Sequence, residues 1–533
     1  MFHVGLFYLF EMPKAADPWA FESYQNTIHQ YSAKLRVSDT AYLTQNHMIL
    51  SQNILSSLMG SILLVLPSAC LAGTGVVILP LNLTQTWAGF FSLIIIALAY
   101  TLAILEDVTF LRKSKPMLLG ATLIWLAILI FYRQQGDTAL AVQAFKENLT
   151  AYMELLLFIM VSMAYLNAME DMQIFNGLRV RLVNLNLGYR PLFWITGTLV
   201  FFISSVINGL TSSLLMGAVV VAVGKDNPRF VSLACLNIVI ACNAGGTFSP
   251  LGGISTLFVW QEGVLKFTDF FTLFLPCLVN FLVPATLMHF AVPEGKPTLS
   301  AQSVRMHRGA RRIMLFFGLT ITLAVVFNMV LELPPAAGMM AGLALLELLS
   351  FYLMKTENRA RLKSAIYPLE PKLIDETEGS GPSQWARSYA VFDQIGRLEW
   401  DSLLFFYGAM VGVGGLGFIG YLDLVSNWLY GQHSASVANI LIGLSSAFID
   451  NGTLMFAVLN MHPDLPQGEW LLVTLTLGVG GSLLAIGSAP GIGLLGLGKG
   501  HYSFGSHMKW CPVILLGYFA AIGTHFLINS RFF

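Results

Sequence analysis

Long apolar runs without charged residues dominate the chain from about residue 85 onward. Two of them, at 87–105 and 117–132, flank the basic turn LRKSKP at 111–116. Each comes close to the roughly 20 residues that an α-helix needs to cross a hydrocarbon core. Their polarity does not alternate, as it does in the strands of a membrane β-barrel. The pattern therefore predicts an all-α polytopic membrane protein.

The same kind of run recurs along the rest of the chain. Residues 1–50 are expected to be a soluble N-terminal extension or a mis-assigned start, and residues 51–75 a signal-like or first transmembrane segment. With interrupted segments counted, we expect roughly 11–13 membrane-embedded segments in all. The further continuous spans are expected at about 151–168, 270–291, 313–331, 334–354, 402–421 and 511–529.

Two polar loops orient these spans. The loop at 292–312 carries five Lys and Arg residues against one acid, and the loop at 355–400 is also rich in Lys and Arg. Cytoplasmic loops collect such residues, and the two spans within 313–354 separate the loops, so we expect both on the cytoplasmic side. They divide the chain into a first transport repeat at 85–291 and a second at 401–533.

Composition further narrows the possible functions of the protein. Charged residues make up 11% of the 533 residues, against about 25% in soluble proteins, and the net charge is zero. A neutral chain lacks the basic surface that nucleic-acid binding needs, so no nucleic-acid partner is expected. The five cysteines include no C-x-x-C pair that would suggest a zinc site. We expect membrane lipid around the spans and no cofactor.

Three other charge-free runs, at 191–224, 230–260 and 470–498, are crowded with Gly, Ser, Thr, Asn and Pro, and the two halves repeat one another there. The segment SVINGLT at 205–211 aligns with AFIDNGT at 447–453, and each half then has a Gly-Gly pair followed by another glycine. Small residues alone can reflect close helix packing. Paired interruptions in two halves instead indicate a transport site near the middle of the membrane.

Asp450 is the acidic residue that this pattern singles out, because it lies between apolar stretches in an interrupted helix. A carboxylate within the membrane usually marks an ion pathway. The alternative is that Asp450 only caps a broken helix. A buried carboxylate can hold either a proton or a cation, so this one residue could exchange one for the other.

Other polar side chains of the interrupted segments complete the candidate site. Glu154 and Glu170 are second-choice carboxylates, and no nucleophile–base or metal constellation appears in the apolar runs, so we assign no catalytic residue and expect no enzyme. A Na⁺ site is expected at Asp450, Asn451 and Asn208. The full set of expected ion- or substrate-binding residues is Asp450, Asn451, Thr453, Asn208, Thr211, Asn243, Ser249, Gly252, Ser482 and Ser488.

From about residue 85 to its end, the chain resembles the NhaD family of bacterial sodium/proton antiporters, within the ion transporter superfamily. The resemblance implies two inverted repeats, each with a re-entrant hairpin and a broken helix, and exchange of Na⁺ or Li⁺ for H⁺ across the bacterial inner membrane. The motifs that carry it are LRKSKP (111–116), AYLNAME (164–170), ACNAGGTFSPLGG (241–253), LVNFLVPA (278–285), EWDSLLFFYGAMVGVGGLGFIGYL (399–422) and GVGGSLLAIGSAPG (478–491).

The chain departs from the family pattern at the expected site. Asn208-Gly209 stand in place of Asp-Asn, Gly253 in place of Asp, and Thr453 in place of Pro. Amide oxygens can bind Na⁺ but cannot release a proton. Two alternatives therefore stay open: a family member with lost or altered proton coupling, and a carrier for an organic or inorganic anion, which half-helix N-termini also suit. The oligomeric state, a homodimer included, is open as well.

Overall fold

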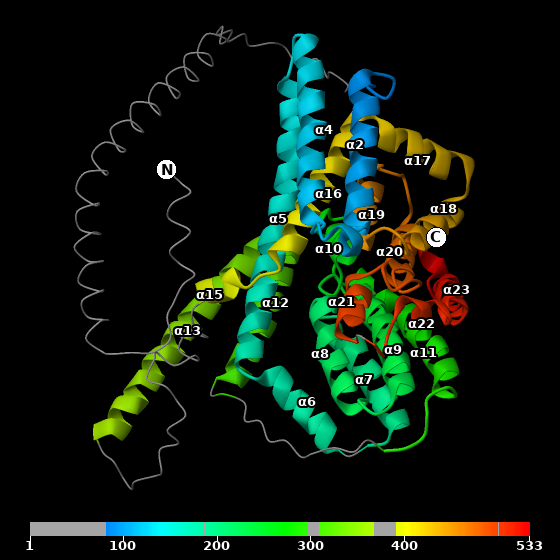
Figure 1. Ribbon diagram of the computed structural model, residues 1–533. Coiled ribbons are helices and arrows are strands. Elements are labelled where there is room, and N and C mark those ends of the chain that lie inside the picture. The colour runs from blue at the N-terminus through cyan, green and yellow to red at the C-terminus, as the bar shows by residue number, and fades with distance from the viewer. Residues whose placement is uncertain (1–81, 186, 297–306, 308, 367–390, 499) are drawn as a thin grey trace, which may run out of the picture. The chain divides into compact units, whose positions relative to one another are not determined.

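The computed structural model describes residues 82–533 except 186, 297–306, 308, 367–390 and 499, and no strand occurs among the described residues. The segments at 1–50 and 51–75 lie outside them. The helices, labelled as in Figure 1, are α2 (Trp87–Ile104), α3 (Glu106–Thr109), α4 (Ser114–Gln134), α5 (Ala139–Asp171), α6 (Ile174–Asn184), α7 (Tyr189–Ile203), α8 (Gly209–Val223), α9 (Pro228–Thr247), α10 (Ile254–Gln261), η1 (Asp269–Leu273), α11 (Phe274–His289), α12 (Ala310–Leu331), α13 (Pro335–Ile366), α15 (Val391–Gly396), α16 (Trp400–Ile419), α17 (Tyr421–Gln432), α18 (Ala435–Ser445), α19 (Asn451–Asn460), α20 (Gln467–Gly480), α21 (Ala489–Leu497), α22 (Phe504–Met508), α23 (Cys511–Ile528) and η2 (Ser530–Phe532).

The helical, membrane-spanning class predicted from the apolar runs is confirmed. Within the described part of the chain, nine helices are long and apolar enough to cross a membrane. Eight coincide with the continuous runs, and the ninth, α9, comes from the glycine-rich run at 230–260. The chain is therefore a multi-pass membrane protein.

Two helices extend beyond the spans expected from the apolar runs. Helix α5 begins at Ala139 rather than near residue 151, and α13 continues to Ile366, into the region expected as a loop from 355. The added part of α13 reads KTENRARLKSAI, which is polar but contains neither Gly nor Pro. Lys, Arg, Leu, Glu and Ala are good helix formers, so the helix continues after its hydrophobic residues end.

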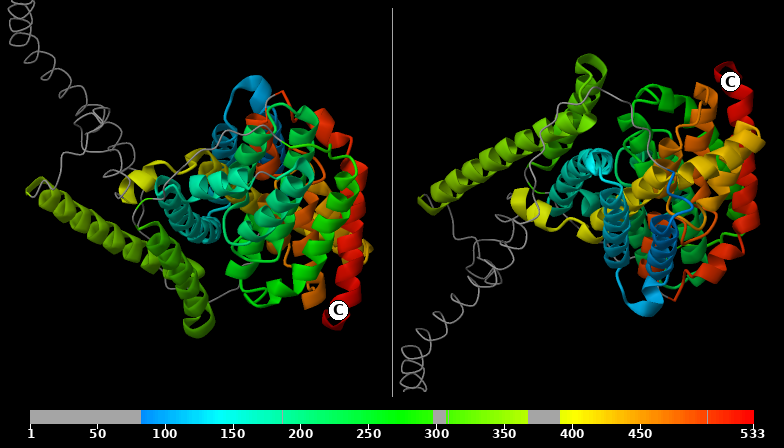
Figure 2. Two further views of the ribbon diagram at one scale, coloured as in Figure 1. Left: turned by 90° about the horizontal axis from the view of Figure 1, so that it is seen from below. Right: turned by 90° about the horizontal axis from the view of Figure 1, so that it is seen from above.

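The described helices pack in two groups. In the first group α4 packs on α2 and α16, and α5 packs on α16 and α13, which pairs with α12. In the second group α9 packs on α7, α8, α11 and α20, while α20 also contacts α18 and α23. Figure 1 shows the first group in the upper and left part and α7, α8 and α9 below, and Figure 2 shows α13 and α23 on opposite sides. The main contact between the groups is α16 against α19.

Non-helical connections interrupt the second group at four places. Three lie in the predicted charge-free runs, and the fourth lies at the repeat segment that contains Asp450. They occupy residues 204–208, 248–253, 446–450 and 481–488, which separate α7 from α8, α9 from α10, α18 from α19 and α20 from α21. Most of their residues are buried or half-buried. Opened backbone of this kind is tolerated within a membrane when protein or a wet cavity surrounds it.

The predicted internal repeat appears in how closely these segments approach one another. A Cβ atom added at Gly245 would lie 2.0 Å from the carbonyl oxygen of Phe201, and one added at Gly480 would lie 2.1 Å from the carbonyl oxygen of Gly443. Phe201 and Gly443 hold equivalent positions in the two halves. Only glycine permits an approach this close, so the paired glycines fix the same packing twice.

Contacts between the halves are reciprocal. Helix α8 of the first half packs on α21 of the second half. The equivalent helices, α19 of the second half and α10 of the first, pack on each other in the same way. The Asn243 side-chain amide also donates a hydrogen bond of 3.0 Å to Ser488 Oγ, joining α9 to the start of α21. These contacts bring the four interruptions together.

Candidate functional site

Asn208 and Asp450 begin equivalent short helices. The Asp450 carboxylate, through Oδ2, accepts backbone hydrogen bonds of 3.1 Å from Gly452 and 3.2 Å from Thr453. The Asn208 side-chain oxygen accepts one of 3.2 Å from Leu210. The capping role that the sequence left open for Asp450 is therefore present. Both bonds end on Oδ2, so the helix cap leaves the second carboxylate oxygen, Oδ1, for other partners.

A cavity of about 650 Å³ lies between the two helix groups. Four of its lining residues are the N-cap residues of α8, α10, α19 and α21, namely Asn208, Gly253, Asp450 and Ser488. The N-terminus of a helix carries partial positive charge, so four of them together stabilise a negative charge in this place. Of these four residues, Asp450 is the one whose side chain can carry such a charge.

Six of the predicted site residues line this one cavity: Asp450, Asn451, Asn208, Asn243, Gly252 and Ser488. Thr453 lies next to Asp450 and is 4% exposed. The structure therefore brings the interrupted segments of both halves to a shared space, as the repeat predicted.

Four predicted residues are not among the lining residues: Thr453, which lies beside Asp450, and Thr211, Ser249 and Ser482. Ser482 Oγ donates to the backbone oxygen of Val479 at 2.5 Å, and Ser249 Oγ accepts from the backbone of Leu251 at 3.3 Å. Both hydroxyls thus serve the local backbone, and Thr211 is not among the lining residues. The second-choice carboxylates Glu154 and Glu170 do not line the cavity either.

The first helix group contributes lining residues that the sequence did not single out. They include Tyr100 from α2, Lys113 at the start of α4, Ser162 from α5, and Glu399 with Ser402 at the start of α16. Burial raises the pKa of Glu399, while the nearby Lys113 ammonium and the Ser402 hydroxyl oppose that rise. Lys113 and Glu399 lie in quoted family motifs, which could have marked them.

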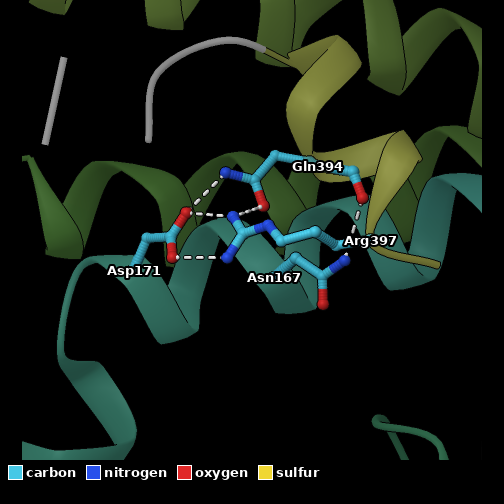
Figure 3. A network of polar contacts seen from close by, with 4 residues as sticks. All are labelled: Asn167, Asp171, Gln394 and Arg397. Atoms are coloured by element: carbon cyan, nitrogen blue, oxygen red, sulfur yellow. Dashed lines mark hydrogen bonds and ion pairs between the residues drawn. The ribbon is translucent and has the colours of Figure 1, made fainter. Parts of the chain in front are cut away.

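A polar network fixes the segment that leads to Glu399 (Figure 3). Arg397 forms a two-pronged ion pair with Asp171 at the end of α5, with Nη1 3.0 Å from Oδ1. The buried Gln394 side chain donates to Asp171 Oδ2 at 2.6 Å, and the Asn167 amide donates to the Gln394 backbone oxygen at 3.0 Å. This network holds α15 and the start of α16 against α5, which sets the position of Glu399 beside the cavity.

Known proteins resemble the chain over most of its length. The family model described as a citrate transporter matches residues 93–366 and 386–478. The Na⁺/H⁺ antiporter NhaD of Vibrio cholerae is 49% identical over 453 residues, which cover 85% of this chain and 94% of that protein. The protein of the same name from Halomonas elongata is 45% identical over 480 residues, or 89% of this chain and 94% of its own.

A plant relative is more distant. Sodium/proton antiporter 1 of Arabidopsis thaliana is 27% identical over 460 residues, which cover 83% of this chain and 72% of that protein. The resemblance noted in the motifs is confirmed. The chain belongs to the family that the matching model describes and, with its close bacterial relatives, to the NhaD family of Na⁺/H⁺ antiporters.

Proposed function

We propose that this protein exchanges Na⁺ or Li⁺ for H⁺ across the bacterial inner membrane, with Asp450 as the group for which the two ions compete. The observation that carries the proposal is the position of Asp450. Among the described residues lining the cavity, it is the one acid that the second helix group contributes, and its Oδ1 is not used by the helix cap. The names of the bacterial relatives support the same exchange.

Competition at one carboxylate can couple the two ions. A proton on Asp450 removes the charge that holds a cation, and a bound cation removes the place for the proton. Asn208 and Asn451 line the same cavity, and an amide oxygen is a possible ligand for a cation, although that of Asn208 also accepts the cap hydrogen bond from Leu210. An ionised Asp450 would repel an anion, and the names of the bacterial relatives, unlike the description of the family model, do not favour an anion carrier.

Two carboxylates of the family pattern are absent from this chain, and their absence affects the number of protons exchanged per cation. Asn208 and Gly253 hold the positions where the family pattern has acids, and neither side chain titrates. On the second-group side of the cavity the proposed exchange therefore runs through Asp450 alone. Membrane lipid would cover the exposed apolar faces of outer helices such as α2 and α12.

The test is Asp450→Asn in proteoliposomes loaded with a pH-sensitive dye. The amide keeps the shape but loses the charge, so Na⁺-driven H⁺ movement should be abolished while the protein stays folded and inserted. Asp423→Asn is the matched control, because Asp423 is an exposed acid on α17 away from the cavity. Normal transport by Asp450→Asn would mean that this carboxylate is only structural.

A further inference from the structure

Two buried hydroxyl groups beside Asp450, Tyr100 Oη and Thr453 Oγ1, form no well-aligned hydrogen bond with a described residue, although Tyr100 approaches Thr453 and Thr453 approaches Asp450. They lie next to each other and close to Asp450, and Tyr100 lines the cavity. Tyr100 comes from α2 in the first helix group, whereas Asp450 and Thr453 belong to the second. The pair therefore spans the boundary between the groups.

An unpartnered buried hydroxyl is unfavourable, because it has lost its water without gaining another partner. Four buried tyrosines of the described chain avoid this cost. Each forms a hydrogen bond: Tyr152 with Leu403, Tyr165 with Gly342, Tyr502 with His507 and Tyr518 with Ile440. The Tyr100 hydroxyl lacks such a hydrogen bond, and Tyr100 lines the cavity.

We propose that Tyr100 Oη is a ligand of the transported cation and that, with Thr453 Oγ1 and Asp450, it completes an oxygen site shared by the two helix groups. The inference rests on the proposed function and adds to it a residue from α2. A hydroxyl oxygen can bind a cation through its lone pairs, and it can equally accept a hydrogen bond from a protonated carboxyl group. The two hydroxyls thus gain a partner in either loaded state of Asp450.

This arrangement also gives α2 a part in transport. A cation held by Tyr100 on one side and by Asp450 and Thr453 on the other draws the two helix groups together. Loss of the Tyr100 oxygen should weaken cation binding but leave Asp450 able to exchange ions. The expected signature is a change in apparent affinity rather than loss of activity.

The test variant is Tyr100→Phe, measured in proteoliposomes and by thermal unfolding of the purified protein with and without Na⁺. The apparent KM for Na⁺ should rise about fivefold or more, with the maximal rate largely kept. Without Na⁺ the variant should unfold at the wild-type temperature or higher, since the hydroxyl has no well-aligned hydrogen bond to lose. The rise in unfolding temperature that Na⁺ produces should shrink.

Tyr165→Phe is the matched control. Its hydroxyl donates to the Gly342 backbone oxygen at 2.7 Å and accepts from Thr320 at 2.8 Å, outside the cavity lining. This variant should unfold at a lower temperature and keep the wild-type Na⁺ dependence. If Tyr100→Phe unfolded at a lower temperature and kept the wild-type Na⁺ dependence, while Tyr165→Phe lost that dependence, the Tyr100 hydroxyl would belong to the protein core. That result would overturn the proposal.

The outcomes separate this inference from the function on which it rests. If the wild-type protein moves no protons when Na⁺ is added, the proposed function fails. If the wild type is active and Asp450→Asn is inactive, but Tyr100→Phe has unchanged KM and unchanged stabilisation by Na⁺, only the Tyr100 assignment fails. Should Tyr100→Phe not insert, Thr453→Val removes the neighbouring ligand, and unchanged Na⁺ affinity there overturns the shared site.

Discussion

Asn208 and Asp450 hold the same position in the two halves, because each is the N-cap residue of a short helix. The ψ angle of each residue is 133°. Their φ angles are −45° and −54°, and each side chain accepts a backbone hydrogen bond from the second residue after it. The backbone frame is therefore symmetric, while the charge is not. One half places a carboxylate in the cavity and the other an amide.

Asn208→Asp tests the consequence of this asymmetry. The variant would keep the cap and add a second titratable group to the cavity, so we expect a higher apparent affinity for Na⁺ or a changed number of protons per cation. Transport in proteoliposomes at imposed pH and Na⁺ gradients would give the ratio from the point at which net flux reverses.

The control for this change is Asn227→Asp. Asn227 is also a helix N-cap, since its side chain accepts a hydrogen bond of 3.1 Å from the backbone of Phe230 in α9, but it does not line the cavity. Its replacement should leave affinity and stoichiometry at the wild-type values. Equal changes in Na⁺ affinity or stoichiometry in both variants would show that an added acid has this effect wherever it is placed.

The sequence predicted much of this frame because its signals are local. Continuous apolar runs predicted the spans, and the aligned segments around Asn208 and Asp450 predicted which parts of the chain meet. Side-chain direction was harder to predict: Ser249 and Ser482 belong to the right motifs, yet their hydroxyls bond to nearby backbone. Tyr100 was missed because it lies in an ordinary apolar span, where only the fold places it beside Asp450.

The glycines of the repeat give a second prediction. Gly245→Ala and Gly480→Ala should each destabilise the protein by roughly 3 kcal/mol or more, because the new methyl group would overlap a backbone oxygen that cannot move alone. Thermal unfolding in detergent measures the loss. Gly318→Ala is the control, since nothing lies within 4 Å of a Cβ added there. If all three variants were equally stable, the close approach would not be a requirement of the fold.

The network around Asp171 gives a third prediction. Asp171→Ala removes the acceptor of both Arg397 and the buried Gln394, so we expect a loss of roughly 1–3 kcal/mol in the free energy of unfolding. The control is Glu294→Ala, which breaks an exposed ion pair with Arg190 at 2.5 Å. Exposed pairs contribute only about 0–1 kcal/mol. Similar unfolding temperatures for the two variants would count against a stabilising role for the network.

The orientation of the chain can be tested by labelling. Ser303 and Ser383 lie in the two basic loops, at positions outside the described residues, and the helices α12 and α13 run between those loops. Because two spans return the chain to the side from which it left, a cysteine at either position should react with an impermeant maleimide only when the reagent reaches the cytoplasmic face. Both sites should therefore be protected in intact spheroplasts and labelled in inverted vesicles. Labelling from opposite faces would mean that one of these helices does not cross the membrane, and labelling of both from outside would reverse the orientation.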